Sequence, residues 1–377
     1  MSKPIYMDYN ATAPLRACAL EAWQEAVTLP GNPSSVHAAG RKAARFLEES
    51  RAKVAGLVNA RPRDIVFTSG GTEANNAVIR QTGAKSLLVS AIEHESILAA
   101  AKASGLTTTI LPVDSVGHIQ LDAFEKALSV AESPCLVSVM LVNNETGTIQ
   151  PMEDIAALAQ RYNARLHIDA IQAAGKLPLD CKTLGADYLT LSAHKIGGPQ
   201  GVGAIVLSPT APLTPLIAGG GQELGRRSGT ENVAGIFGFG AAALEAMASL
   251  GDMQHIGALR DTLERAITKD CPDAIIIAKD GKRVANTSCI ALPGISGETQ
   301  VMHFDLAGIC VSSGSACSSG KVKVSHVLSA LGYDQSTANA SIRVSLGWES
   351  KSSDIDAFVK AYKALYTRTA ERRSEGL

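Results

Sequence analysis

A lysine that follows an apolar run is the most distinctive chemical feature of the sequence. Lys195 ends the segment Ser192-Ala193-His194-Lys195, and the glycine-rich residues 197–203 follow it. Lysine forms Schiff bases with carbonyl groups once it is deprotonated, and glycines let the backbone approach a ligand closely. Because most lysines are simply solvated, the meaning of Lys195 depends on the residues that accompany it.

One other apolar run ends in a carboxylate, and another ends in a glycine turn. Asp169 closes the run His167-Ile168-Asp169, and a pyridine ring that serves as an electron sink needs an acidic partner for its nitrogen. The turn Ser69-Gly70-Gly71-Thr72-Glu73 precedes a helical pattern, and the free N–H groups of a helix N-terminus bind phosphate. The plainer interpretations are that Asp169 caps a helix and that Thr72 is the N-cap of an ordinary turn. Together with Lys195, however, these residues place a lysine, a carboxylate and a phosphate-binding turn at the ends of three apolar runs.

A cysteine lies among small polar residues in the last part of the chain. Cys317 stands within residues 312–320, a run of Ser, Gly and Ala, and a thiol in such an exposed loop is usually avoided unless it reacts. The seven cysteines are scattered, with no CxxC pair, which argues against disulfides and favours a reducing compartment. His303, Cys310 and Cys317 lack the spacing of a zinc site, so we expect no metal.

Charge and composition limit the kinds of partner. The 35 Lys and Arg residues nearly balance the 36 Asp and Glu residues, for a net charge of −1, which gives no electrostatic reason to expect nucleic acid or a membrane surface. No apolar run reaches the ~20 residues that span a bilayer, and the first residues lack the layout of a signal or transit peptide. We expect a cytoplasmic protein with a small-molecule substrate and protein partners.

The elements that must position these residues follow an alternating pattern. Short apolar runs alternate with helical patterns, which predicts an α/β fold with a mostly parallel sheet flanked by helices. The carboxyl ends of parallel strands meet at one edge, so Lys195, Asp169 and the 69–73 turn would lie together there. Strands are expected at 64–68, 86–90, 107–111, 135–142, 165–169, 187–191 and 203–207, and helices at 38–58, 73–81, 95–103, 121–130 and 152–162.

The sequence pattern changes after a small-residue helical stretch at about 232–250. We expect a large domain of residues 15–255 and a smaller α+β domain made of residues 1–14 and 256–377, which carries Cys317. The expected elements of the smaller part are a helix at 256–268, strands at 274–277 and 287–291, a helix at 298–306, a Ser- and Gly-rich loop, and two more helical stretches.

Taken together, these segments resemble the cysteine desulfurases, in the class V aminotransferase group of fold type I pyridoxal-phosphate enzymes. The resemblance covers nearly the whole chain, and SAHK with a downstream SSGSAC is its most specific part. The other motifs include SGGTEANN, Asn143-Asn144-Glu145-Thr146-Gly147, HIDAIQ, Arg227-Ser228-Gly229-Thr230 and Ser341-Ile342-Arg343-Val344-Ser345.

The resemblance implies a reaction and a set of partners. A homodimer would use pyridoxal 5′-phosphate to convert L-cysteine to L-alanine and would place the sulfur on Cys317 as a persulfide. A sulfur acceptor, or a scaffold protein for iron–sulfur cluster assembly, would then receive the sulfur. Lys195 would hold the cofactor aldehyde and move a proton at the substrate Cα, His94 would stack on the ring and assist proton transfer, and Arg343 would bind the substrate carboxylate.

The remaining roles concern the cofactor. By the same resemblance, Asp169 would pair with the ring nitrogen, while Gln172 and Asn144 would approach the ring hydroxyl. The residues that would contact the phosphate are Thr72, Ser192 and His194, together with Thr230, which would reach the phosphate bound by the neighbouring subunit.

Other functions remain compatible with parts of this pattern. An aminotransferase, or a cysteine lyase that releases sulfide, would keep Lys195 and Asp169 but would not need Cys317. A selenocysteine lyase is a second alternative within sulfur chemistry that the sequence leaves open. A binding protein without catalysis would not need the intact set of Lys195, Asp169, His94 and Arg343.

Overall fold

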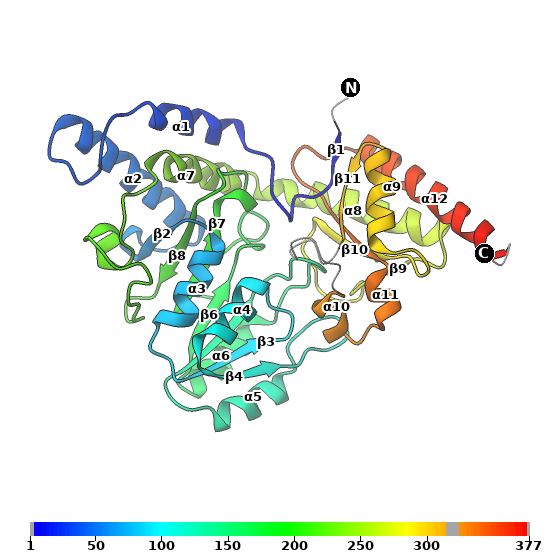
Figure 1. Ribbon diagram of the computed structural model, residues 1–377, viewed down its shortest axis with the longest axis horizontal. Coiled ribbons are helices and arrows are strands. Elements are labelled where there is room, and N and C mark those ends of the chain that lie inside the picture. Colours follow the sequence, from blue (N-terminus) through cyan, green and yellow to red (C-terminus); the bar gives the residue numbers. More distant parts are fainter. Residues whose placement is uncertain (1–3, 314–323, 375–377) are drawn as a thin grey trace.

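The computed structural model describes residues 4–313 and 324–374 and contains a large and a small sheet side by side (Figure 1). The large sheet has the strand order β2-β8-β7-β6-β5-β3-β4, and only β8 runs antiparallel to its neighbours. The predicted mostly parallel α/β fold is therefore confirmed. The strands are β2 (Ile65–Thr68), β3 (Ser86–Ser90), β4 (Thr107–Leu111), β5 (Cys135–Met140), β6 (Arg165–Asp169), β7 (Tyr188–Ser192) and β8 (Gly203–Leu207).

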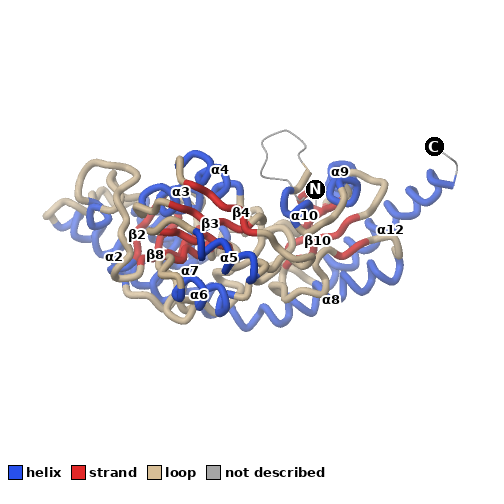
Figure 2. Tube along the Cα trace, turned by 90° about the horizontal axis from the view of Figure 1, so that it is seen from below, coloured by secondary structure: helices blue, strands red, loops and turns tan. Residues whose placement is uncertain are grey.

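Helices cover both faces of this sheet because its strands are apolar on both sides. Along β5, Leu136 packs into one core cluster while Val137 and Val139 pack into the other, as the two-residue period of a strand requires. Figure 2 shows α3 and α4 on one side of the sheet and α6 and α7 on the other. The helices of this part are α1 (Ala17–Val27), α2 (Ala38–Leu57), α3 (Gly71–Gln81), α4 (Glu95–Ser104), α5 (Leu121–Val130), α6 (Met152–Arg161) and α7 (Val233–Ala248).

The small sheet is built from the last part of the chain, and the N-terminal strand pairs beside it. Its strand order is β12-β13-β10-β9, and a separate pair places β1 (Ile5–Tyr6) parallel to β11 (Ile309–Cys310). This pairing supports grouping residues 1–14 with the C-terminal part, although the domain boundaries remain a prediction. The other elements are α8 (Met253–Asp270), β9 (Ile275–Ile276), β10 (Thr287–Ala291), α9 (Gly297–Leu306), β12 (Ser312–Ser313), α10 (His326–Ala330), α11 (Gln335–Asn339), β13 (Ser341–Ser345) and α12 (Ser352–Ser374).

The expectation that only two helical stretches follow the Ser- and Gly-rich loop is wrong. Three helices and the strand β13 follow it, and β13 is the partner of both β10 and β12. This strand was missed because its alternate residues are Ser341, Arg343 and Ser345, which are buried although they are polar. They face hydrogen-bonding partners rather than an apolar layer, so the usual apolar signal of a buried strand is weak here.

Among the described residues, none of the individual helices has both the length and the apolar character needed to cross a membrane. The pair Val233–Ala248 and Leu250–Asp270, bent by 53°, meets the criterion together by length and composition alone.

Stacked aromatic rings hold the helices that support the small sheet, and we expect their loss to destabilise the protein. Phe304 of α9 and Phe358 of α12 are fully buried with ring centroids 4.7 Å apart. Phe358→Ala should lower the free energy of unfolding by about 3–5 kcal/mol because it leaves a cavity. Denaturant unfolding measures this, with exposed Val130→Ala as the control. Equal stability of the two variants would contradict the packing described here.

Candidate active site

A cavity of about 360 Å³ opens where the strands of the large sheet end. Most of its lining residues lie at or just after the carboxyl ends of β2, β3, β5, β6 and β7, where open α/β sheets bind their ligands; Asn10, Ala11 and Arg343 are contributed by the N-terminal segment and by β13. Its size is that of a small-molecule site. Of the residues predicted from the sequence, the structure brings nine to this cavity: Thr72, His94, Asn144, Asp169, Gln172, Ser192, His194, Lys195 and Arg343.

Two predicted site residues fall outside this group. Thr230 is exposed and does not line the cavity, so its role toward a neighbouring subunit stays a prediction. Cys317 lies outside the described residues. No group of three or more His, Cys, Asp or Glu side chains is placed to hold a metal within residues 4–313 and 324–374.

The described residues on either side of the 314–323 segment are anchored near Arg343. Ser312 pairs with Arg343 across β12 and β13, and its hydroxyl donates to a carboxylate oxygen of Asp8. On the other side, the Ser325 hydroxyl donates to Oε2 of the buried Glu145 at 2.6 Å. The described residues that flank the segment containing Cys317 therefore lie close to residues of the cavity.

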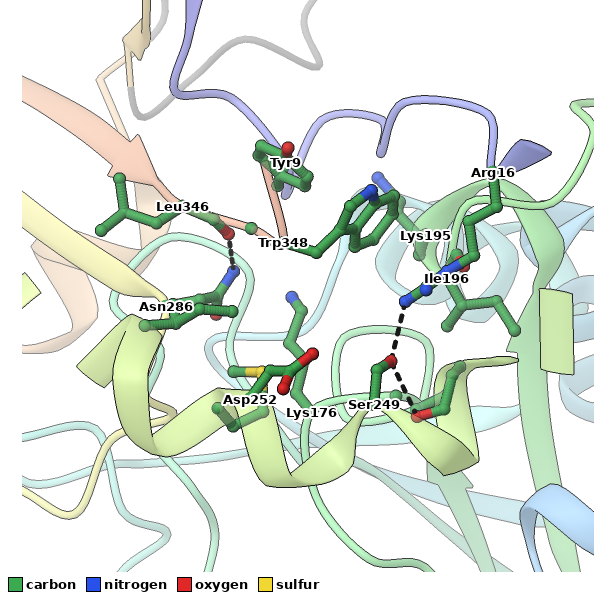
Figure 3. Close-up of a pocket in the computed structure, with 16 residues that line it drawn as sticks. Tyr9, Arg16, Lys176, Lys195, Ile196, Ser249, Asp252, Asn286, Leu346 and Trp348 are labelled. Carbon is green, nitrogen blue, oxygen red and sulfur yellow. Dashed lines mark hydrogen bonds between the residues drawn. The ribbon is translucent and has the colours of Figure 1, made fainter. Parts of the chain in front are cut away.

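Lys195 is held over the end of β7 by backbone carbonyls. A short 3₁₀ turn, Ala193–Lys195, follows the strand, and Nζ donates to the carbonyl oxygens of Asn10 and Ala11, each at 2.7 Å. The same side chain lines both the large cavity and a narrower hollow of about 30 Å³ (Figure 3). Its amine is thus positioned by the N-terminal segment, which the sequence did not associate with it.

Asp169 lies at the end of β6 with both carboxylate oxygens in hydrogen bonds. Oδ1 accepts from the backbone N–H of Ile171 and Oδ2 accepts from Nδ2 of Asn75, each at 2.9 Å. Burial raises the pKa of Asp169 above its ordinary value, and these hydrogen bonds and the charge of Lys195 oppose that rise. The carboxylate can therefore pair with a positively charged partner in the cavity, in addition to capping its own turn.

Asn75 connects the two acid–base groups of the cavity, and the sequence analysis missed it. Its Nδ2 also donates to Ser96 Oγ at 2.9 Å, and Ser96 Oγ lies 2.8 Å from His94 Nδ1. A chain of hydrogen bonds thus links Asp169 to His94. The available signal was a fully buried amide inside the SGGTEANN motif, at a helical position where an apolar residue would ordinarily pack.

His94 is a neutral imidazole whose proton lies on Nε2. It is the N-cap of α4, and its Nδ1 accepts from the backbone N–H of Ser96 at 3.1 Å, so Nδ1 carries no proton. Burial, and then the positive charge of Lys195, lowers the pKa of His94 to about 4. The tautomer leaves Nε2–H as the only N–H of the ring.

The phosphate-binding expectation rests on the N-terminus of α3. This helix begins at Gly71 with Gly70 at the N-cap position and no side-chain cap, so the interpretation of Thr72 as the N-cap is wrong. An uncapped N-terminus leaves backbone N–H groups for an anion. Glu73, which would repel an anion here, is paired with Arg227 at 2.9 Å.

Arg343 places a buried positive charge at the cavity. It is 3% exposed, its Nη2 donates to Asp8 Oδ1 at 2.9 Å, and its Nη1 donates to the carbonyl of Asn144 at 3.1 Å. Its Nε is buried and has no hydrogen-bond partner among the described residues. Because the side chain lines the cavity, its charge favours a carboxylate bound there.

Comparison with known proteins assigns the chain to a family. The model of the class V aminotransferases matches residues 5–358. A cysteine desulfurase of Cereibacter sphaeroides is 42% identical over 367 residues, which cover 94% of each chain, and the cysteine desulfurase IscS of Dictyoglomus turgidum is 38% identical, covering 94% of this chain and 93% of that one. The chain belongs to the class V aminotransferase family, among its cysteine desulfurases.

Solved structures of relatives have the same fold. The NifS-like protein of Rickettsia africae superposes with a TM-score of 0.90 at 36% identity, covering 97% of this chain and 99% of that one. SspA in complex with cysteine superposes with a TM-score of 0.78 at 30% identity, covering 91% of this chain and 98% of that one. The predicted assignment to the fold type I class is confirmed by these matches.

The protonation state of His94 is open to direct measurement. We expect its ring resonances to titrate with a midpoint of about 4, compared with an ordinary value of 6.5. Because the folded pKa is lowered, the unfolded chain binds more protons, and stability falls as pH decreases from about 6.5 toward 4. NMR of the cofactor-free protein measures the midpoint, with His94→Asn to assign the signal. A midpoint near 6.5 would contradict the buried neutral ring.

Proposed function

We propose that this cysteine desulfurase works through Lys195, Asp169 and His94, with pyridoxal 5′-phosphate in the cavity at the strand ends. The observation that carries the proposal is the convergence of an amine, a buried carboxylate, an uncapped helix N-terminus and a buried arginine on one cavity of about 360 Å³. The amine matches the aldehyde of the cofactor, the buried carboxylate matches its ring nitrogen, and the helix N-terminus matches its phosphate. The arginine matches the carboxylate of an amino acid substrate.

The cofactor would be held by groups from separate strand ends. Asp169 would bind the ring nitrogen, Gln172 and Asn144 would lie at the ring hydroxyl, and Lys195 would bind the aldehyde carbon. The phosphate would be bound by Thr72, Ser192 and His194. When bound, pyridoxal phosphate supplies an electron sink that stabilises negative charge at the Cα of an amino acid.

The protein groups supply charge compensation and proton transfer. A positive ring nitrogen would offset the desolvation that raises the pKa of Asp169, which keeps the carboxylate ionised. Lys195 would accept the Cα proton on Nζ once it has left the carbonyls of Asn10 and Ala11. His94, neutral with its proton on Nε2, is suited to donate a hydrogen bond or to stack rather than to serve as a second cation.

The sulfur step would use Cys317 as the nucleophile. Its thiolate would attack the sulfur of the substrate L-cysteine, and a sulfur–sulfur bond would form as the carbon–sulfur bond breaks. The electron pair of the broken bond would remain on carbon, which gains a proton to give L-alanine, and Cys317 would carry the persulfide. The balance needs no external oxidant, and a thiolate is required because the thiol is a poor nucleophile.

The substrate is supported by a relative, and the partners are part of the proposal. SspA, 30% identical to this chain, has been solved in complex with cysteine, which supports L-cysteine as the substrate. A homodimer would allow the exposed Thr230 to reach the phosphate bound by the neighbouring subunit. A sulfur acceptor or an iron–sulfur scaffold protein would take the persulfide sulfur from Cys317.

Transfer of labelled sulfur tests the proposal. With sulfur-labelled L-cysteine, the holoenzyme should form alanine and carry label on the peptide that contains Cys317. Cys317→Ser should carry no label and lose alanine formation by at least about 100-fold, as loss of a nucleophile does. Cys310→Ser, a partly buried cysteine of β11, is the matched control and should behave as the unmodified protein. Label retained in Cys317→Ser would reassign the carrier, and sulfide or a keto acid without label would indicate a lyase or an aminotransferase.

A further inference from the structure

A second lysine lies next to the proposed cofactor site without a role in the steps above. Lys176 Nζ donates to Oε1 of Gln172 at 2.6 Å and to Oδ1 of Asn10 at 2.8 Å. Both partners are uncharged amide oxygens of buried side chains. Burial, and then the charges of Lys195 and Arg343, holds the pKa of Lys176 well below its ordinary value. An amine donates hydrogen bonds in both of its protonation states, so these two contacts do not depend on its charge.

The contacts of Lys176 fix which way the Gln172 amide faces. Because Lys176 donates to Oε1, the nitrogen end of the amide is directed to the backbone carbonyl of Asn10, to which Nε2 donates at 2.9 Å. Gln172 lines the large cavity. An amide nitrogen carries two hydrogens, so the second N–H remains for a ligand in the cavity.

The same network fixes Asn10, which in turn positions Lys195. Asn10 Oδ1 accepts from Lys176 and from Nδ2 of Asn286 at 3.1 Å, and Asn10 Nδ2 donates to Thr287 Oγ1 at 2.9 Å. Each polar atom of the Asn10 amide thus has a partner, which leaves it one orientation. Its backbone carbonyl accepts hydrogen bonds from both Gln172 and Lys195. The network therefore positions the Gln172 amide and the Lys195 amine together.

Lys176 lies outside the lining of the large cavity. It lines the narrower hollow of about 30 Å³, together with Lys195, Asn286 and Trp348 (Figure 3). Its two hydrogen-bond partners, Gln172 and Asn10, both line the large cavity. Lys176 therefore acts on that cavity through these two side chains, which is a positioning role.

We propose that Lys176 is a positioning residue: it locks the Gln172 amide so that an N–H, not the carbonyl, faces the oxygen of the bound cofactor ring. This inference rests on the proposed placement of Gln172 at the ring hydroxyl. A donor at that oxygen stabilises its anionic form, so the donor's loss makes the oxygen more basic. The pH at which the absorbance of the bound cofactor changes reports this basicity.

The test is a pH titration of the absorbance of the holoenzyme and of its variants. In Lys176→Met, Gln172 Oε1 loses its donor and the amide is no longer locked. We expect the titration midpoint to rise by about one pH unit, the size that corresponds to one hydrogen bond, and the cofactor dissociation constant to rise by about tenfold. Lys182→Met, a nearby exposed lysine, is the matched control and should leave both values unchanged.

Gln172→Ala distinguishes a failure of the role of Lys176 from a failure of the proposed placement of Gln172. If Gln172→Ala shifts the midpoint and folded Lys176→Met does not, the role of Lys176 is overturned while the cofactor site stands. If Gln172→Ala causes no shift, the proposed placement of Gln172 itself fails. A loss of thermal stability alone, without a shift in the midpoint, also overturns the positioning role.

A second variant without a donor covers a failure to fold. If Lys176→Met does not fold, Lys176→Leu, whose side chain is shorter and also carries no donor, replaces it in the same titration. We expect the same upward shift of about one pH unit. A midpoint equal to that of the unmodified holoenzyme, with Gln172→Ala shifted, would overturn the role of Lys176.

Discussion

The hydrogen bond from Lys195 to the carbonyl of Asn10 is the contact on which the arrangement of the site depends. Lys195 directly follows β7 of the large sheet. Residues 8–12, in contrast, follow β1, which pairs with β11 in the C-terminal part of the chain. The same short segment binds Arg343 through Asp8 and His194 through Thr12. Groups from the two sheets therefore meet at one N-terminal segment, and a shift of that segment would displace the amine and the arginine together.

Burial, together with the positive charges of Lys195 and Arg343, explains much of the electrostatics of the cavity. Lys195 contributes to the lowered pKa of His94, His194 and Lys176, in each case after burial itself. Arg343 is only partly compensated by Asp8, because its Nε lacks a partner in the described part of the chain. A site of this kind favours anionic ligands, which agrees with a phosphorylated cofactor and an amino acid carboxylate. Two imidazoles remain neutral there, first because they are buried and then because Lys195 repels a further positive charge.

The sequence predicted the strands that carry the chemistry because their apolar runs are long and bounded by turns. The predictions at 86–90 and 165–169 coincide with β3 and β6, and those at 64–68 and 187–191 lie within one residue of β2 and β7. The polar residues at these strand ends were therefore predicted to meet where the cavity lies. The strand β13 was missed because its buried face is polar. Asn10, Asn75 and Lys176 were missed for a related reason: their roles arise from hydrogen bonds between segments far apart in the chain, which residue spacing does not reveal. The place of Cys317 remains a prediction from its motif.

Trapping the cofactor on its lysine would test the central claim most directly. Borohydride reduction of the holoenzyme fixes a carbonyl cofactor to the amine that holds it, and peptide mapping by mass spectrometry then identifies the residue. We predict that the modified peptide carries the cofactor on Lys195, the lysine held at the strand end of β7. Modification of Lys176 instead, or the absence of any modified lysine in the cofactor-loaded enzyme, would contradict the assignment of this cavity as the active site.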